Sequence, residues 1–307
     1  MRVKNSSILS SSQKALTIGT FDGVHLGHQK ILKSVISVAK EKGLKSAVLT
    51  LFPHPRMVLN KDSNIKLLNT IDERIAMMRT IGIDEVIVKE FTFEFSQLSA
   101  KDYVKQILVD ELKAKTIIIG YDHHFGKNRS ANIQDLIAFS KVYDFEVQEI
   151  NALTLNDVNI SSTKIRTALS EGNVTLANEY LGYEYMLTGK VVYGKKLGRT
   201  LGFRTANIEV EADYKLIPKD GVYVVKSEIN EQTYFGMMNI GQNPTIENAE
   251  SSIEVHYFDF DQDLYGQTIS VKLLKRLRDE YHFESIDALK VQLEKDKTRS
   301  LDYINSM

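Results

Sequence analysis

Apolar positions in the first half of the chain alternate between two periodicities. Ala15–Thr20 is an apolar run of strand length, and from about Gly27 apolar side chains recur at helical spacing until Gly43, a residue type that often ends helices. Lys45–Phe52 is again strand-like. The alternation continues to residue 150, with helices predicted over 70–80, 99–112 and 132–143 and strands over 85–88, 116–119 and 145–150. Strands alternating with helices predict a parallel sheet covered by helices.

The texture changes at Tyr185, after two short helical patterns over residues 163–169 and 174–181 that end the first domain. A closing helix is predicted from about Ser285. Between them lie short β-rich runs separated by turns that contain glycine, which predict an antiparallel barrel or sandwich. The runs cover residues 187–193, 222–228, 236–240, 253–258 and 268–273. We therefore predict two domains, residues 1–183 of α/β class and residues 184–307 of β class.

Charge and composition narrow the choice of partners and compartment. The chain has 307 residues, a formal net charge of −1 and no cysteine. Near-neutral charge gives little electrostatic support to nucleic-acid or membrane-surface binding, so we expect neither partner. The absence of cysteine excludes disulfides and thiolate metal sites. No apolar run approaches the ~18 residues that span a bilayer, so we expect a cytoplasmic protein, for which an oligomer is possible but not indicated.

One stretch gathers glycines and two histidines between the first strand and the first helix. It reads Thr17-Ile-Gly-Thr-Phe-Asp-Gly-Val-His-Leu-Gly-His-Gln-Lys30. Backbone N–H groups at a helix start, together with His25 and His28, would stabilise a phosphate, and Gly27 allows close backbone approach. The alternatives are a surface helix cap with solvated histidines, or a zinc site, although no third ligand is evident. We favour the phosphate site.

Two further loops share the predicted carboxyl edge of the sheet, where ligands bind in such folds. They are Phe52–Arg56, which holds two prolines around His54, and Gly120–Gly126, which holds a histidine pair. Each alone has a simpler interpretation, as a stiff turn and as a polar connection. Ile160–Arg166 places hydroxyl and cationic side chains at a helix start, which suits a triphosphate or a leaving pyrophosphate. Taken alone, the motif favours an ordinary Ser/Thr N-cap with surface cations.

The second half offers different chemistry. Gly198–Asn207 ends in threonine and asparagine, whose oxygens are hard ligands that Mg²⁺ accepts together with phosphate and water. Its alternative is a glycine-rich hairpin. Glu254 and His256 share one face of a strand by its period of two, and a carboxylate there is a candidate general base. Spacing alone favours an exposed polar face for these two residues.

These motifs, in this order, resemble the bacterial bifunctional riboflavin kinase/FAD synthetase family over nearly the whole chain. Any one motif is short, but the ordered set is specific. The adenylyltransferase half is matched by Thr20–His28, Phe52–Arg56, Gly120–Gly126 and Ser161–Arg166; the flavokinase half is matched by Arg199–Asn207, Asp220–Tyr223, Asn239–Thr245, Glu254–His256 and Leu264–Gly266.

The resemblance implies a Rossmann-like adenylyltransferase domain followed by a small antiparallel flavokinase barrel with a terminal helix. The barrel would phosphorylate riboflavin to FMN with ATP. The first domain would join FMN to ATP, giving FAD and pyrophosphate. ATP is implied as co-substrate, Mg²⁺ as cofactor, and the flavins as substrates and products.

The resemblance also implies roles for residues at matching positions. His25, His28 and Glu254 would be the catalytic side chains. In the adenylyltransferase half, ATP would contact Gly19, Phe21, Asp22, His25, His28, Asp122, Ser162, Thr163 and Arg166, and the flavin would contact His54, Pro55, His123 and Phe125. In the kinase half, ATP would contact Gly194, Lys195, Thr205 and Asn207, the last two also holding Mg²⁺, and the flavin would contact Glu254, Arg278 and Phe283.

Two positions depart from the family pattern. Arg204 stands where the family usually has proline, and His123 stands where it often has phenylalanine. Arg204 motivates an alternative, in which the chain is an FAD synthetase whose barrel is a flavin-binding regulatory module. A nucleic-acid-binding barrel is a further alternative that rests on β-rich texture alone, and the near-neutral charge speaks against it.

Overall fold

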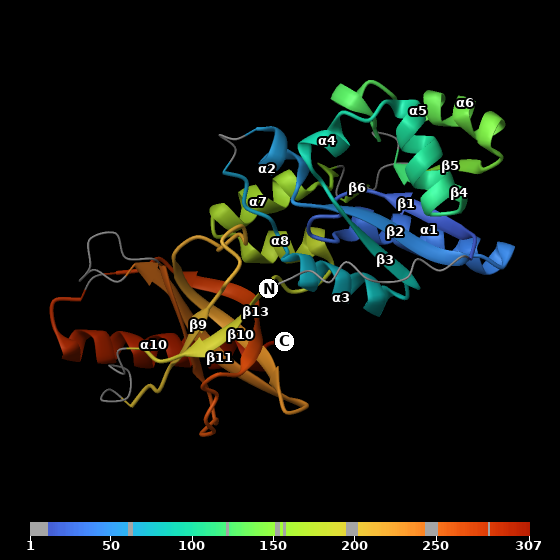
Figure 1. Ribbon diagram of the computed structural model, residues 1–307. Helices are drawn as coiled ribbons and strands as arrows, with labels where there is room; N and C mark the ends of the chain where they lie inside the picture. The colour runs from blue at the N-terminus through green and yellow to red at the C-terminus, as the bar shows by residue number, and fades with distance from the viewer. Residues whose placement is uncertain are drawn as a thin grey trace. The chain divides into compact units, whose positions relative to one another are not determined.

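The structure is a computed structural model that describes residues 12–60, 64–120, 123–150, 154–155, 158–194, 202–242, 251–281 and 283–307. The chain divides into two compact units, Met1–Ser161 and Ser162–Met307 (Figure 1). Among the described residues, no helix has the length and apolarity that crossing a membrane requires.

The first unit is a five-stranded parallel sheet in the order β3-β2-β1-β4-β5, which confirms the predicted α/β class. Its regular elements are β1 (Lys14–Ile18), α1 (Leu26–Lys42), β2 (Lys45–Phe52), α2 (Pro55–Leu59), α3 (Ile71–Ile81), β3 (Glu85–Glu90), α4 (Phe93–Ser96), α5 (Ala100–Asp102), η1 (Tyr103–Glu111), β4 (Ala114–Gly120), η2 (Lys127–Arg129), α6 (Ile133–Tyr143), β5 (Glu146–Ile150), β6 (Thr154–Leu155) and β7 (Val158–Asn159).

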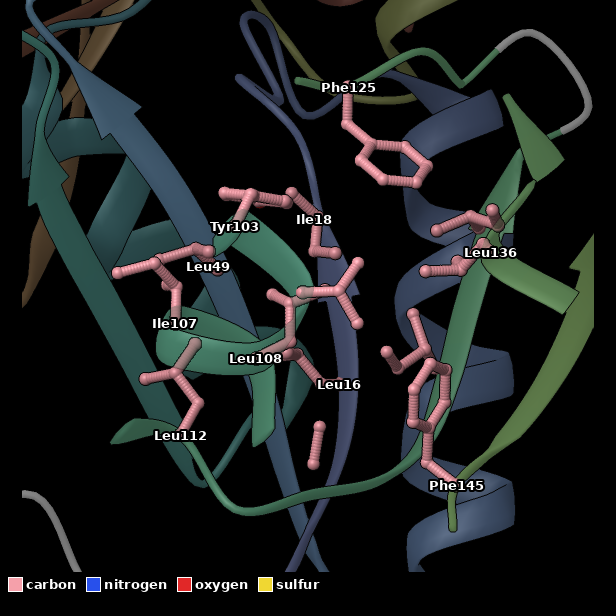
Figure 2. Close-up of a cluster of buried hydrophobic side chains, with 14 of the residues drawn as sticks. Leu16, Ile18, Leu49, Tyr103, Ile107, Leu108, Leu112, Phe125, Leu136 and Phe145 are labelled. Atoms are coloured by element: carbon pink, nitrogen blue, oxygen red, sulfur yellow. The ribbon is translucent and has the colours of Figure 1, made fainter. Parts of the chain in front are cut away.

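Both faces of the central strands β1, β2 and β4 are largely buried, which is why these strands read as nearly continuous apolar runs. The outer strands β3 and β5 are only partly buried. Leu16 and Ile18 of β1 point into a cluster that η1 and α6 cover, shown in Figure 2. Ala15, the neighbour of Leu16 in β1, points to the opposite face of the sheet and packs into a second cluster with Leu32 and Val35 of α1. The helix predicted over 99–112 is mainly the π-helix η1, with Leu112 N donating to Ile107 O at 2.9 Å, a wider turn that periodicity does not distinguish from an α-helix.

The second unit contains a closed antiparallel barrel in the order β10-β11-β12-β9-β8-β13, so the barrel alternative is confirmed over the sandwich. Its elements are α7 (Ser162–Ser170), α8 (Val174–Leu181), β8 (Met186–Val192), β9 (Ala206–Glu209), β10 (Gly221–Ile229), β11 (Gln232–Gln242), β12 (Ser251–Tyr257), β13 (Thr268–Arg278) and α10 (Ile286–Asn305). The short strand β9, which the β-rich runs did not include, is the piece that closes the barrel, because it pairs with both β8 and β12.

The helices α7 and α8 pack with the barrel, whereas the sequence analysis grouped them with the first domain. Asn178 of α8 fastens them, since its side-chain amide donates to Leu273 O of β13 at 2.9 Å and its side-chain oxygen accepts from Tyr185 N at 2.8 Å. Tyr185, fully buried, donates its hydroxyl to Leu216 O at 2.6 Å. A domain boundary at residues 183/184 stays a prediction.

Candidate functional sites

The first candidate site lies at the carboxyl edge of the parallel sheet. β1 pairs with β2 on one side and with β4 on the other, so the chain reverses its direction of growth across the sheet at β1. In open parallel sheets, ligands bind outside the carboxyl ends of the strands at such a reversal. The loops that follow β1, β2 and β4 all leave from this edge, and they are the loops that the motifs mark.

Two histidines form the centre of the loop after β1. His25 caps α1, with its Nδ1 accepting from His28 N at 3.4 Å. The two rings stack with centroids 3.6 Å apart and planes inclined by 17°. Burial, then His25, then Arg74 hold the pKa of His28 well below its usual value of 6.5, so this ring is neutral at pH 7. A neutral imidazole can donate one hydrogen bond and accept another, which suits contact with a phosphate oxygen.

His28 Nδ1 is buried and has no hydrogen-bond partner within the described part of the chain. A buried polar atom in that condition costs free energy unless a ligand or water satisfies it. The Phe21 ring meets His28 edge-on at 5.1 Å and closes the other side. Residues Gly19–His28 form what we call the histidine corner. It therefore places a ring nitrogen that can bind a ligand next to the first turn of α1, as a phosphate site requires.

Two glycines permit this close packing. A Cβ on Gly19 would lie 3.1 Å from the Phe21 ring, and a Cβ on Gly27 would lie 3.2 Å from the His25 imidazole. Phe21 itself is 3% exposed and belongs to the buried cluster beneath α1. Gly19 and Phe21 therefore shape the corner, and their contact with ATP stays a prediction.

Asp22 points into the protein. Its Oδ1 accepts from Leu68 N at 2.9 Å and from Asn69 N at 3.3 Å, and the residue is 1% exposed. Arg74 Nη2 lies 3.8 Å from the same oxygen. The contacts that surround Asp22 give it an anchoring function, and ATP binding by its carboxylate stays a prediction.

The sequence analysis missed Arg74. This side chain is fully buried and donates from Nη1 to Thr20 O at 2.6 Å, just before the two histidines. A signal was present, because Arg74 occupies the stripe between Ile71 and Met78 that faces inward from α3. A cation at an apolar position of an amphipathic helix indicates a buried partner.

The loop after β2 begins a short helix. His54 caps α2, its Nδ1 accepting from Arg56 N at 3.1 Å, and Pro55 is the first residue of that helix. This supports the simpler interpretation of the segment as a turn, since the ring nitrogen serves the backbone. Flavin contact by His54 and Pro55 stays a prediction.

The loop after β4 is partly core. Phe125 is 7% exposed and its ring lies 5.9 Å from that of Tyr103, inside the cluster of Figure 2. His123 stacks on Phe125 at 6.0 Å. Of the two, His123 presents more surface to a ligand, and flavin binding by either stays a prediction. Asp122 lies outside the described residues.

Ser162, Thr163 and Arg166 occupy the first turns of α7, as the motif predicts for a helix start. Thr163 is exposed, and the other two are partly buried. These residues belong to the second unit of the fold. Their contact with the ATP of the adenylyltransferase half stays a prediction.

The second candidate site is assembled by strand register. Glu254 of β12 pairs with Asn207 of β9, and Thr205 Oγ1 donates to Glu254 Oε2 at 3.2 Å. Ile253, Val255 and Tyr257 turn into the barrel, so Glu254 and its neighbour His256 lie on the opposite face, half-buried. The carboxylate is thus neither core nor freely solvated, and it lies among hydroxyl and amide groups.

Gly194 completes this cluster from the end of β8. A Cβ at Gly194 would lie 2.2 Å from Asn207 Nδ2 and 2.6 Å from its Oδ1, so a larger residue at this position would force the Asn207 amide to move. Lys195 lies outside the described residues. A cavity borders Thr205 on the inner side of the sheet and is lined also by Ala206, Val255 and Tyr265.

Arg278 and Phe283, predicted to contact the flavin, lie near each other at the end of β13. The Arg278 guanidinium is 5.8 Å from the Phe283 ring and 5.1 Å from the Tyr281 ring. Its Nε and Nη2 donate to the carboxylate of Asp296 on α10 at 3.0 Å and 2.7 Å. The ion pair fixes the guanidinium against α10, and flavin contact stays a prediction.

Arg204, the departure from the family pattern, is held at both ends. Its guanidinium pairs with Asp261, and its carbonyl lies 2.8 Å from His256 Nδ1. Burial lowers the pKa of His256, which the hydrogen bond to this carbonyl partly opposes. The arginine therefore supplies contacts at a position where proline would supply a fixed backbone angle.

The fold is that of a two-part transferase, with one candidate site in each unit. The FAD synthetase family model matches residues 8–164, and the riboflavin kinase family model matches residues 181–304. The chain therefore belongs to the bifunctional riboflavin kinase/FMN adenylyltransferase family and combines both activities. The match to the second half supports this over an FAD synthetase with a regulatory barrel.

Two curated relatives and one solved structure resemble this chain over nearly its whole length. The bifunctional riboflavin kinase/FMN adenylyltransferase of Listeria monocytogenes is 41% identical and covers 92% of this chain and 90% of its own; that of Bacillus subtilis is 37% identical and covers 96% and 94%. A Streptococcus pneumoniae crystal structure described as a macrolide-efflux protein superposes with a TM-score of 0.86 at 33% identity, covering 95% of each chain. The words 'macrolide-efflux protein' describe the pneumococcal protein and not this chain. What the two proteins share is the fold.

Proposed function

We propose that the two activities use two separate ATP sites, the histidine corner after β1 for adenylylation and the Thr205–Glu254 cluster for the kinase. The observation that supports this division is chemical. The first site offers two stacked imidazoles and a helix start, and the second offers a carboxylate among hydroxyl and amide oxygens. Each set matches what one of the two reactions requires.

The adenylyl transfer joins two phosphates. An oxygen of the FMN phosphate forms a bond to the α-phosphorus of ATP, the bond from that phosphorus to the β-bridging oxygen breaks, and pyrophosphate leaves. The nucleophile is already anionic, so no base is needed. His25, His28 and the N–H groups of the first turn of α1 stabilise the charge that develops on the phosphoryl oxygens.

The kinase reaction starts from an alcohol. The 5′-hydroxyl of the riboflavin ribityl chain forms a bond to the γ-phosphorus of ATP, ADP leaves, and the hydroxyl proton goes to Glu254. Thr205 positions the carboxylate, because its hydroxyl donates to Oε2 and leaves the other carboxylate oxygen available.

The residues of the second site fit Mg²⁺. Thr205 Oγ1 donates a hydrogen bond to Glu254 and keeps its lone pairs, and Asn207, which pairs with Glu254 across the strands, brings a side-chain amide oxygen to the same site, so both oxygens can serve as hard ligands. No group of three or more histidine, cysteine or acidic side chains able to hold a metal occurs in the described ranges, which agrees with an ion held mainly by phosphates and water. Such an ion would neutralise charge on the phosphates of ATP.

Paired substitutions test the separation of the two sites. His28→Ala is expected to lower FAD formation from FMN and ATP by about 100-fold or more, with FMN formation from riboflavin unchanged. Glu254→Gln is expected to lower FMN formation by about 100-fold to 10,000-fold and to spare FAD formation from supplied FMN. Product chromatography on the same full-length preparations measures both.

Glu209→Gln is the matched control for the carboxylate, since Glu209 is exposed on β9 of the same barrel. It is expected to leave both activities unchanged. Loss of both activities from either single substitution would refute separate sites. Omitting Mg²⁺ is expected to abolish the kinase reaction, and full activity with a chelator present would refute the metal assignment.

The implied partners are small molecules: riboflavin, FMN and ATP. Because both reactions consume ATP, we propose that the enzyme works in the cytoplasm. Fractionation of cells that express the chain checks this, and recovery of the activity outside the cytoplasmic fraction would contradict it.

A further inference from the structure

Arg74 is a buried cation that neither proposed reaction uses. It lies on the inward stripe of α3 between Ile71 and Met78 and is 0% exposed. Burying an arginine is unfavourable unless neighbouring groups compensate its charge and its donors. Its neighbours therefore show what this position accomplishes.

The guanidinium holds both ends of one short segment. Nη1 donates to Thr20 O at 2.6 Å, and Nη2 lies 3.8 Å from Asp22 Oδ1. Thr50 of β2 also donates to Thr20 O, at 3.2 Å. The planar fork of an arginine can serve two acceptors in a fixed orientation, which the single ammonium of a lysine does not reproduce.

The backbone in and just after the Thr20–Asp22 segment adopts an unusual conformation, which contacts of this kind help to hold. Phe21 and Val24 adopt φ angles of 49° and 36°, in the left-handed region that non-glycine residues rarely occupy. For Val24, which is β-branched, this conformation is a strained one that persists only where surrounding contacts impose it. Gln29 adds one such contact, donating from Nε2 to Val24 O at 3.0 Å. The corner leads directly into His25, the cap of α1.

The helix that carries Arg74 is itself well fixed at this point. Thr70 and Glu73 form a reciprocal capping box, with Glu73 N donating to Thr70 Oγ1 at 3.1 Å and Thr70 N donating to Glu73 Oε2 at 2.9 Å. Asp22 receives the backbone N–H groups of residues 68 and 69 just before this cap. The corner and the start of α3 are therefore tied together from both sides.

We propose that Arg74 is a positioning residue of the adenylyltransferase site: it holds the Thr20–Asp22 segment in its strained conformation and so presents His25 and His28 to the phosphates of ATP without touching them. This rests on the proposed function of the two histidines. A corner ordered in advance binds phosphate without a cost of ordering at each encounter.

The test compares Arg74→Met with Arg79→Met in the full-length chain. Arg79 is an exposed arginine on the same helix, so its loss controls for helix composition. Adenylylation is measured with FMN supplied, and riboflavin kinase activity on the same preparation is the internal control. Arg74→Met is expected to raise the KM for ATP by about tenfold or more, with kinase activity unchanged and Arg79→Met normal in both.

KM separates positioning from folding. A smaller folded fraction lowers kcat and leaves KM unchanged, whereas a loosened corner raises KM for ATP. Arg74→Lys, which keeps the charge without the fork, is expected to fall between the wild type and Arg74→Met. An Arg74→Met protein that is folded and has a wild-type KM for ATP overturns the proposal.

Where Arg74→Met does not fold, the double variant Asp22→Asn/Arg74→Met removes both buried charges and decides the question. Asp22→Asn alone is the reference, and a KM for ATP that is higher in the double variant than in Asp22→Asn supports positioning. A KM equal to that of Asp22→Asn overturns it, because Arg74 would then only neutralise Asp22. His28→Ala runs in parallel: if it retains full FAD formation, the proposed function of the histidines fails, independently of the outcome at Arg74.

Discussion

The two sites are built in opposite ways. In the first, His25 and His28 are three residues apart and meet because a helix begins between them. In the second, Thr205 and Glu254 are 49 residues apart and meet through the register of β9 and β12. A local motif needs support from outside to hold its shape, whereas a register-built site inherits its shape from the barrel.

Each unit also contains a buried arginine–aspartate pair. Like the two sites, the two pairs differ in whether they hold a loop or join regular elements. Arg74 is 3.8 Å from Asp22, whose carboxylate is already occupied by backbone N–H groups, so this pair shapes a loop. Arg278 donates twice to the fully buried Asp296, so this pair fastens β13 to α10. The short bidentate pair of Arg278 and Asp296 joins two elements of the barrel unit. The longer pair of Arg74 and Asp22, whose carboxylate is shared with backbone N–H groups, fixes the conformation of a loop.

The largest expected effect is on stability, at the bidentate pair. Arg278→Met leaves the Asp296 carboxylate buried with Gln292 as its remaining side-chain donor among the described contacts, and is expected to lower the free energy of unfolding by about 3–5 kcal/mol. Arg204→Met, which breaks the exposed pair with Asp261, is the matched control and is expected to cost about 0–1 kcal/mol. Urea unfolding of both variants measures the difference, and equal losses would show that burial does not distinguish the pairs.

The next effect is on catalysis, at the glycine of each site. Gly194→Ala would drive a Cβ into the Asn207 amide, so kcat/KM of the kinase for ATP is expected to fall by about 10-fold to 100-fold. Gly27→Ala meets the His25 ring only at 3.2 Å, and adenylylation is expected to fall about threefold at most, since a small side-chain shift relieves the contact. Steady-state kinetics of both reactions measure these effects. A larger loss of adenylylation in Gly27→Ala than of kinase activity in Gly194→Ala would contradict the view that strand register fixes the kinase site more rigidly.

The smallest effect is on the pH dependence of stability. Because the folded pKa of His28 lies below 6.5, the unfolded chain binds a proton on this ring that the folded chain does not, once the pH falls below that value. The free energy of unfolding is expected to be unaffected by His28 above about pH 6.5 and to fall by up to about 1.4 kcal/mol per pH unit below it.

His28→Gln is expected to remove this part of the slope in urea unfolding at pH 7.5, 6.5 and 5.5. His256, whose pKa is lowered as well, keeps its own contribution in both proteins and therefore cancels from the difference. Parallel stability curves for wild type and variant would show that His28 is not held neutral.

The order of most elements followed from the sequence, whereas the chemistry expected of the motifs stays a prediction. Apolar periodicity predicted the alternating sheet, because burial on both faces leaves a nearly continuous apolar run in each of the central strands β1, β2 and β4. The glycines, His25 and His28 could be assigned together because helix-start chemistry is local and needs only neighbouring residues. The ordered motifs identified the family before any contact was known.

Only the tertiary structure decided how distant residues combine. The short strand β9 closes the barrel through pairing on both edges, a property that a run of only four residues, two of them polar, does not reveal. Phe125 turned out to be core, since its burial depends on η1 and α6. Arg74 acts across 54 positions of sequence on Thr20, and such a contact exists only when the helix and the loop are folded together.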